Sequence, residues 1–260
     1  MKNIQKQRLV RSRVKVASDS AKQRRYLLAL MTGIVLLLCM QLANAKIAPL
    51  AASLSSEPVK APSLQSYIGP TRNMGLDAFE NGKHADAASI LRPLALAGDA
   101  ESQYYLGVMH DNGAGVSFDI PMAVRWYRKA AQQGHSDAQY NLGIAYSRGE
   151  GIEHDMSSAI YWWRKAGMQG NLDAQFNLGV AYSTGRGIER DYLQAIHWWR
   201  KAARLGDSIA QYNLGALYAH GVGVDMDMAK AAGWWQRSAA QGNQQAKAAL
   251  RLLQQQQASR

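Results

Sequence analysis

Cysteine is almost absent from this sequence. One of the 260 residues is a cysteine, Cys39, and it lies in an apolar run near the N-terminus. Residues 46–260 contain none, which excludes a disulfide scaffold, a cysteine nucleophile and a thiolate metal site from that part of the chain. A body without cysteine is compatible with an oxidising compartment.

Acidic residues are too few to balance the basic ones, but only near the N-terminus. The chain has 30 Lys and Arg against 19 Asp and Glu, a formal charge of +11. Residues 1–45 hold nine basic residues and one acid, Asp19, which leaves 21 basic and 18 acidic residues in 46–260. Because nucleic-acid binding depends on concentrated positive charge, we predict that this nearly neutral body binds no nucleic acid.

Groups of residues that could carry out chemistry are also missing. The six histidines are scattered, and no two stand at metal-ligand spacing on one predicted helix. A serine nucleophile with a lysine base would need a Ser-x-x-Lys motif, and the only copy, Ser12 to Lys15, lies in the basic N-terminal segment. We therefore predict that the protein is not an enzyme and holds no metal and no cofactor.

The N-terminus has the three parts of a secretory signal. The basic stretch is followed by an apolar run of 14 residues from Leu27 to Met40, and then by the small residues Ala43 and Ala45. We predict a signal peptide over residues 1–45, whose cleavage leaves the body in the periplasm. The run is short for a membrane span of about 20 residues, and the basic region is long for a signal peptide. The alternative is an uncleaved inner-membrane anchor, with residues 26–42 associated with the membrane and the body outside the cytoplasm.

Glycine, by contrast, is abundant and recurs with a fixed period. Gly107, Gly143, Gly179 and Gly215 are each 36 residues apart, and Ala-Gln-Tyr/Phe-Asn-Leu precedes three of them. Adjacent aromatic residues recur in the same register at 126–127, 162–163, 198–199 and 234–235. Four copies at constant spacing predict an internal structural repeat.

Each copy is predicted to fold as two helices. Around Leu142, apolar residues recur at three- and four-residue intervals, which is the period of a helix with one buried face. Gly143 lies inside that helix at a cost of about 1 kcal/mol relative to Ala, so its recurrence predicts the close approach of another helix. The first helix is expected to end at Gly149. The second is expected to begin at an N-cap, Asp155, and to end near Gly170.

One helix pair cannot bury its own apolar face, so the copies must stack. We interpret the two aromatic columns, at 126, 162, 198 and 234 and at 127, 163, 199 and 235, as packing between copies. The alternative is that these side chains are exposed and bind a ligand. The predicted fold is all-α, an α-solenoid (superhelix) of stacked antiparallel helix pairs with a 36-residue repeat.

These motifs resemble the Sel1-like repeat (SLR) family of the tetratricopeptide-like superfamily, in its exported bacterial type. The resemblance covers residues 100–243 and rests on Ala-Gln-Tyr-Asn-Leu-Gly at 138–143, the Gly-x-Gly turn, the Asp cap and the paired tryptophans. The predicted organisation is a signal peptide or anchor (1–45), a flexible linker rich in Pro and Ser (46–63), a degenerate tetratricopeptide-like opening repeat (64–99), four repeats (100–135, 136–171, 172–207 and 208–243), and a closing helix with a frayed tail from Gln254 (244–260).

The resemblance implies a scaffold for protein–protein interaction. We predict a non-catalytic adaptor outside the cytoplasm that binds a protein or peptide partner in the concave groove of the superhelix. The alternative is a cell-wall or carbohydrate-binding repeat protein that uses exposed aromatic residues as sugar platforms. The two differ in a simple way, because a sugar platform needs aromatic faces that are open to solvent.

By analogy with tetratricopeptide grooves, the first helix of each pair is expected to line the groove. The candidate partner-binding residues form two columns seven residues apart, Tyr105, Asn141, Asn177 and Asn213 in the first, and Asn112, Arg148, Thr184 and His220 in the second. The first column is uniform, and its alternative role is structural, with Asn side chains bonding neighbouring backbone. The second column varies in chemistry, as expected of residues that recognise a specific partner; the alternative is that variation is tolerated next to the turns.

Overall fold

The computed structural model describes residues 64–258. The chain divides into two units, Met1–Lys60 and Ala61–Arg260, and all the described residues belong to the second. The predicted signal peptide or anchor (1–45) and the predicted linker (46–63) lie outside the described residues. Within residues 64–258, no helix combines the length and the apolar character that a membrane crossing requires.

Residues 64–258 form eleven helices and no strand, which confirms the all-α prediction for this part of the chain. The first helices of the four repeats are α5 (Ala100–Asn112), α7 (Ser136–Arg148), α9 (Leu172–Thr184) and α11 (Ser208–His220). The second helices are α6 (Ile120–Gln132), α8 (Met156–Met168), α10 (Tyr192–Arg204) and α12 (Met228–Ala240). Before them stand α3 (Leu64–Glu80) and α4 (His84–Leu96), and after them stands α13 (Gln244–Ala258).

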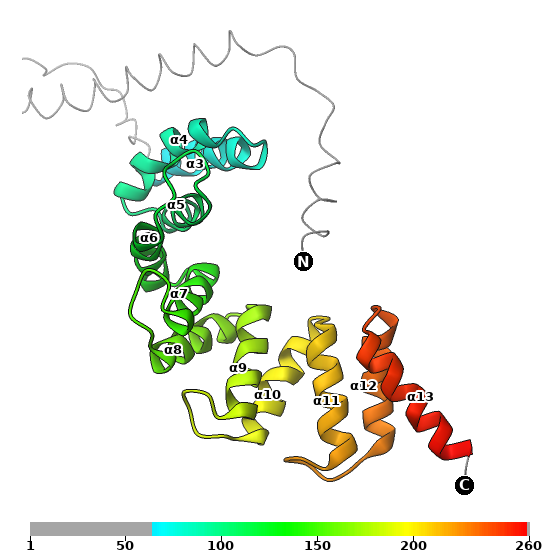
Figure 1. Ribbon diagram of the computed structural model, residues 1–260. Helices are drawn as coiled ribbons and strands as arrows, with labels where there is room; N and C mark the ends of the chain where they lie inside the picture. Colours follow the sequence, from blue (N-terminus) through cyan, green and yellow to red (C-terminus); the bar gives the residue numbers. More distant parts are fainter. Residues whose placement is uncertain (1–63, 259–260) are drawn as a thin grey trace, which may run out of the picture. The chain divides into compact units, whose positions relative to one another are not determined.

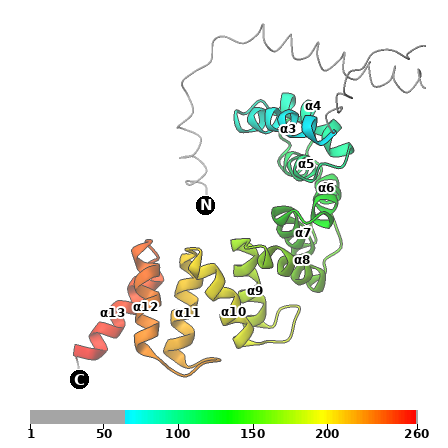
Figure 2. The same ribbon diagram turned by 180° about the vertical axis from the view of Figure 1, so that it is seen from behind.

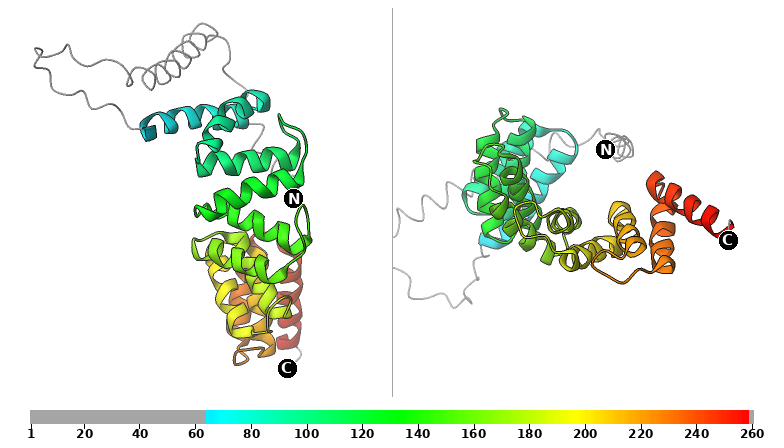
Figure 3. Two further views of the ribbon diagram at one scale, coloured as in Figure 1. Left: turned by 90° about the vertical axis from the view of Figure 1, so that its left-hand side faces the viewer. Right: turned by 60° about the horizontal axis from the view of Figure 1, so that its bottom comes forward.

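The helices stack in the order of the sequence. The extensive contacts in this part of the chain join each helix to the next one, and Figures 1 and 2 show the succession from α3 to α13. Figure 3 shows it from two further directions. Packing between sequence neighbours is the arrangement of an α-solenoid, as predicted. The tail was expected to fray from Gln254, but α13 continues to Ala258, because Gln and Ala are good helix formers and no Gly or Pro interrupts them.

The first helix of each repeat ends at a glycine, as predicted. Gly149 has a φ of 70°, and its N–H bonds the Ala145 carbonyl. Side chains with a Cβ are strained in this left-handed region. The second glycine of the turn, Gly151, has a φ of 69°, and a Cβ there would lie 2.7 Å from Ile120 of the preceding repeat. The Gly-x-Gly turn thus reverses the chain and also packs closely on the repeat before it.

Asp155 begins α8, as predicted. Its carboxylate accepts hydrogen bonds from the backbone N–H groups of Ser157 and Ser158, at 2.9 and 3.1 Å. The Ser158 hydroxyl and these backbone bonds hold the pKa of Asp155 below its usual value. The other second helices have equivalent caps at Asp119, Asp191 and Asp227.

An indole explains the glycine inside each first helix. A Cβ on Gly143 would lie 2.5 Å from the ring of Trp163, on the partner helix of the same pair, and Gly179 stands against Trp199 in the same way. The Trp199 Nε1–H also donates a hydrogen bond of 3.2 Å to the backbone carbonyl of Phe176. The predicted close approach is therefore an aromatic ring lying directly on backbone.

The two aromatic columns differ in burial. The column at 127, 163, 199 and 235 is buried throughout, with Tyr127 at its first position and tryptophan at the other three. In the other column Trp126 and Trp198 are buried, but Trp162 and Trp234 are only partly buried and pack at the edge of the core. Packing between copies is confirmed for Trp198, which lies against Gly167 of the preceding repeat, whereas the rings of Trp163 and Trp199 lie on glycines of their own helix pair.

Buried glutamines link successive repeats, a feature the sequence analysis missed. The Gln139 Nε2 donates a hydrogen bond of 3.0 Å to the Ala131 carbonyl, at the end of the preceding second helix. The Gln139 Oε1 accepts a bond of 2.8 Å from Gln169, at the end of the next one. Gln103 and Gln211 make the same two kinds of bond. Each of these side chains therefore joins three consecutive elements, through a buried bond to the carbonyl and a partly buried bond to the second glutamine.

One position in this glutamine series is incomplete. The Gln175 Nε2 bonds the Gly167 carbonyl at 2.9 Å, but Leu205 stands where the donor glutamine would be. The Gln175 Oε1 is consequently buried without a hydrogen-bond partner among the described residues.

Candidate functional site

The first candidate column lies near the middle of the first helices. Its members Tyr105, Asn141, Asn177 and Asn213 are all partly exposed. Burial raises the pKa of Tyr127 and that of Tyr140, and side-chain hydrogen bonds with Asn141 and Asn177, respectively, offset part of the rise. These two asparagines thus bond neighbouring side chains, whereas the structural alternative expected backbone partners.

Tyr105 differs from the rest of its column. Its ring packs edge-on against Phe79 of α3, with 5.3 Å between the ring centroids. Burial and the nearby carboxylates of Glu101, Glu80 and Asp137 raise the pKa of Tyr105. It belongs to the contact between the opening helices and the first repeat.

The second candidate column occupies the last residue of each first helix. Asn112, Arg148, Thr184 and His220 are all exposed. Asn112 and Thr184 each donate a side-chain bond of 2.8 Å to the backbone carbonyl four residues earlier. Arg148 Nη1 lies 3.6 Å from Glu150 Oε2, in a pair whose two side chains are more than half exposed. We call the surface formed by both columns the first-helix face.

Two clefts open on this face, between successive repeats. Cleft 1 has a volume of about 130 Å³ and lies between α5, α6 and α7; its polar lining includes Asp111, Asn141, Arg148 and Glu150. Cleft 2 has a volume of about 230 Å³ and lies between α7, α8 and α9; its polar lining is Ser147, Arg148, Asn177 and Arg186, beside the buried Trp163. Arg148 lines both clefts.

The two clefts are the same site one repeat apart. Asn177, Ser147 and Arg186 of cleft 2 each follow a residue of cleft 1 by 36 positions, namely Asn141, Asp111 and Glu150. The structure therefore brings together three of the candidate residues, Asn141, Arg148 and Asn177. The other five line neither cleft.

A buried tyrosine holds one carboxylate of cleft 1 in place. The Tyr127 hydroxyl donates a hydrogen bond of 3.2 Å to Asp111 Oδ2. Burial raises the pKa of Tyr127, and the Asp111 charge raises it further, so the tyrosine stays a neutral donor. In cleft 2 the equivalent of Asp111 is Ser147, which has no charge.

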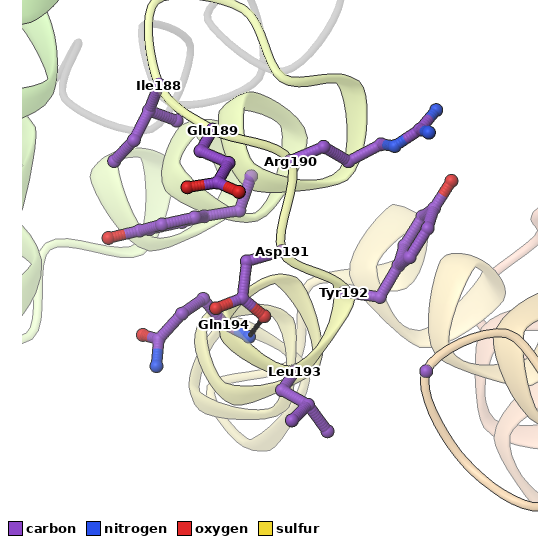
Figure 4. A pocket seen from close by; sticks show the side chains of 9 residues that line it. Ile188, Glu189, Arg190, Asp191, Tyr192, Leu193 and Gln194 are labelled. Atoms are coloured by element: carbon purple, nitrogen blue, oxygen red, sulfur yellow. Dashed lines mark hydrogen bonds between the residues drawn. The ribbon is translucent and has the colours of Figure 1, made fainter.

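A larger open cleft of about 590 Å³ lies beside the turn that follows α9 (Figure 4). Of its two carboxylates, Glu189 and Asp191, Asp191 accepts a hydrogen bond of 3.0 Å from the Gln194 backbone N–H. Arg190 lies 5.6 Å from the centroid of the Tyr192 ring. Asp191 is thus occupied as a helix cap. No group of three or more potential metal ligands occurs within residues 64–258.

A cation lies near the ring of each tryptophan in the column at 126, 162, 198 and 234. The Lys129 Nζ lies 4.5 Å from the Trp126 ring centroid, and the same spacing of three residues joins Lys165 to Trp162, Lys201 to Trp198 and Arg237 to Trp234. A sugar ring would stack on an open aromatic face. At these four positions a cation lies over the ring, which does not favour the carbohydrate alternative.

The sequence analysis did not single out His135, which lies at the start of a first helix. It is the N-cap of α7, where its Nδ1 accepts a bond of 3.2 Å from the Ala138 N–H. The ring stacks on Tyr104 at 4.5 Å, and its Nε2 lies 3.4 Å from Glu101 Oε2. The signal was its register, because Asp99 and Asn171, 36 residues away on either side, are ordinary capping residues.

The helix pairs, their constant spacing and their stacking define a tetratricopeptide-like α-solenoid. A family model described as Sel1 repeat matches residues 100–135, 136–171, 172–207 and 208–243, more than half of the chain. The chain belongs to the Sel1 repeat family. Proteins of this family are generally non-catalytic scaffolds that bind other proteins.

Two of the solved structures that are similar to this chain also share about a third of its sequence over the matched part. A Sel1 repeat protein from Oxalobacter formigenes is 32% identical, with a TM-score of 0.65, over 68% of this chain and 70% of that chain. A protective antigen of uropathogenic Escherichia coli strains, which displays an SLR fold, is 36% identical, with a TM-score of 0.67, over 70% of this chain. The matched part spans 40% of the length of the E. coli protein. A comparison with curated proteins gave no match.

Proposed function

We propose that this protein is a non-catalytic adaptor that binds a protein or peptide partner in a groove formed by its first-helix face. The observation that carries the proposal is the position of Arg148, an exposed cation that lines two clefts between successive repeats together with Asn141 and Asn177. A single arginine shared by two clefts can form a bidentate bond to a partner carboxylate. The scaffold character of the family agrees with this role.

The setting that we propose is outside the cytoplasm. The basis is the basic stretch that ends at Arg25, the apolar run Leu27–Met40 that follows it, and the small residues Ala43 and Ala45. We expect alkaline phosphatase, which is active only when exported, to be active when fused after Arg260. N-terminal sequencing that starts at Lys46 would indicate a cleaved signal, and an intact Met1 would indicate an anchor through residues 26–42. A stable but inactive fusion would contradict export.

Site-specific cross-linking tests the binding face. A photo-reactive amino acid placed at Thr184, exposed at the end of a first helix, should form adducts with the partner in cells. The matched control is Arg125, which is also exposed and lies on the second helix α6, where we expect no adduct. Adducts at Arg125 but none at Thr184 would assign the partner to the second helices and end the proposal.

A further inference from the structure

We infer that clefts 1 and 2 act as a pair and recognise an extended partner segment that carries one basic and one acidic side chain. The inference rests on the proposed function and names the chemistry of the partner. Its starting point is the difference in charge between two equivalent clefts. Cleft 1 contains the carboxylates of Asp111 and Glu150 with one guanidinium group, that of Arg148, whereas cleft 2 contains the guanidinium groups of Arg148 and Arg186 and no acid.

The change in charge arises at two repeat-equivalent positions. Where cleft 1 has Asp111, cleft 2 has Ser147, and where cleft 1 has Glu150, cleft 2 has Arg186. The surrounding lining stays similar, since Ile144 of cleft 1 is matched by Val180 and Asn141 by Asn177. The two clefts therefore have similar linings but different charges: cleft 1 suits a cation and cleft 2 suits an anion.

The charged groups that line the clefts are exposed, although Asp111 accepts a hydrogen bond from Tyr127. Arg148 and Glu150 form a loose pair at 3.6 Å, with side chains 61% and 56% exposed, and such exposed pairs contribute only about 0–1 kcal/mol. Arg186 is exposed in the turn after α9. A partner carboxylate in cleft 2 would replace Glu150 as the counter-ion of Arg148, which leaves Glu150 for a partner cation in cleft 1.

The spacing of the clefts selects the form of the partner segment. Each cleft lies between the first helices of neighbouring repeats, and the two clefts adjoin at Arg148, which lines both. A polyproline-type segment has three residues per turn and rises about 3.1 Å per residue. Side chains three residues apart then lie on one side of the segment, about 9 Å from each other. The partner that fits is an extended segment with opposite charges at positions i and i+3.

Fluorescence anisotropy with four labelled peptides tests this inference on the full chain. Their central sequences are Lys-Pro-Pro-Glu, Glu-Pro-Pro-Lys, Glu-Pro-Pro-Glu and Lys-Pro-Pro-Lys. We expect one of the two mixed peptides to bind at least fivefold tighter than both like-charged peptides. A general attraction to the basic chain would instead favour Glu-Pro-Pro-Glu, and that result, or the absence of binding, would overturn the inference.

Charge reversals locate the effect. Arg186→Glu should make Lys-Pro-Pro-Lys the preferred peptide, and Glu150→Arg should make Glu-Pro-Pro-Glu the preferred one. The matched control is Arg125→Glu on α6, which changes the net charge as Arg186→Glu does and should leave the order of the four peptides unchanged. An unchanged order in the Arg186→Glu protein, with circular dichroism as in the wild type, would reject the paired site.

The two proposals fail separately. Cross-linking at Thr184 without a peptide preference would retain the adaptor role and reject the paired clefts. A peptide preference without cross-linking would retain the clefts as a peptide site and reject the adaptor role as proposed.

Discussion

Leu205 occupies a position where the other repeats carry a glutamine that donates to a buried side-chain oxygen. We predict that Leu205→Gln supplies the missing donor to Gln175 Oε1 and raises the free energy of unfolding by about 1 kcal/mol, the net value of one hydrogen bond. Urea unfolding of the variant measures it. Leu205→Ala removes the same exposed side chain without adding a donor, so an equal gain in that control would disprove the mechanism.

The glycines inside helices offer a second test at the scale of single residues. Alanine is intrinsically better than glycine in a helix by up to about 1 kcal/mol. At Gly143 the added Cβ would meet the Trp163 ring at 2.5 Å, and overpacking typically costs about 1–3 kcal/mol. We expect Gly143→Ala to lower the melting temperature.

Gly233 of α12 is the matched control for this prediction, because a Cβ there would meet nothing within 4 Å. Gly233→Ala should therefore raise the melting temperature, by an amount that corresponds to the helix propensity alone. Equal effects of the two substitutions would mean that the indole does not restrict position 143.

At the scale of elements, the first turns of α5, α7 and α9 carry a row of acids, Glu101, Asp137 and Asp173. Burial raises the pKa of Asp173, and the charges of Asp207 and Asp137 raise it further. An acid whose pKa is raised by folding stabilises the fold when protonated, and this contribution is lost as the pH rises through the folded pKa. The Asp173 carboxylate is thus unfavourable near neutral pH.

We predict that Asp173→Asn increases thermal stability at pH 7 and that the gain shrinks at pH 3, where the wild-type carboxyl is protonated in the folded and the unfolded chain. Melting curves of both proteins at the two pH values test this. Glu189→Gln, at an exposed position in a turn, controls for the loss of one negative charge. A gain of equal size at both pH values would exclude electrostatic repulsion as its cause.

Local signals made the helix boundaries predictable. Gly149 and Asp155 act on their own neighbours, through backbone conformation and capping bonds, so their residue types suffice to place a helix end. The glutamine series was missed because buried positions were identified from apolar residues, and Gln139 is polar. Its role also depends on a carbonyl of another helix, which the local sequence does not specify. The partial burial of Trp162 depends on how the surrounding helices are arranged, and the helical period of the sequence does not specify that arrangement.

The candidate site was predictable only where one helix determined it. Arg148 was expected from its place at the end of a first helix, and the structure places it in both clefts. Asp111 and Arg186 were missed because the candidate columns were restricted to two positions per helix, whereas the clefts also take residues from a neighbouring position and from the next turn. A comparison of positions 36 apart would have shown the exchange of Glu150 for Arg186.

At the scale of the whole molecule, contacts between sequence neighbours make the repeats separable units. We predict that deletion of residues 172–207, which joins Asn171 to Ser208, leaves a folded chain with the same helicity per residue and a lower unfolding free energy. The new junction keeps an N-cap at Asn171 and places Gln211 where Gln175 was. Circular dichroism and urea unfolding measure both quantities.

Deletion of half a repeat, residues 172–189, is the informative counterpart. It would place two second helices in succession and remove the indole-on-glycine contact from one of them. We expect this variant to lose cooperative unfolding. Cooperative folding at the stability of the whole-repeat deletion would show that the 36-residue unit is not the structural unit.

The constant packing between repeats has a consequence for how such a chain changes over generations. Because each junction contains the same bond from a glutamine side chain to a carbonyl of the preceding second helix, a gene segment that encodes one repeat can be gained or lost by unequal recombination without a new interface. The side chains at positions 112, 148, 184 and 220 are exposed and take no part in that bond. Copy number, and with it the length of the recognition surface, can therefore evolve independently of the residues that decide what is recognised.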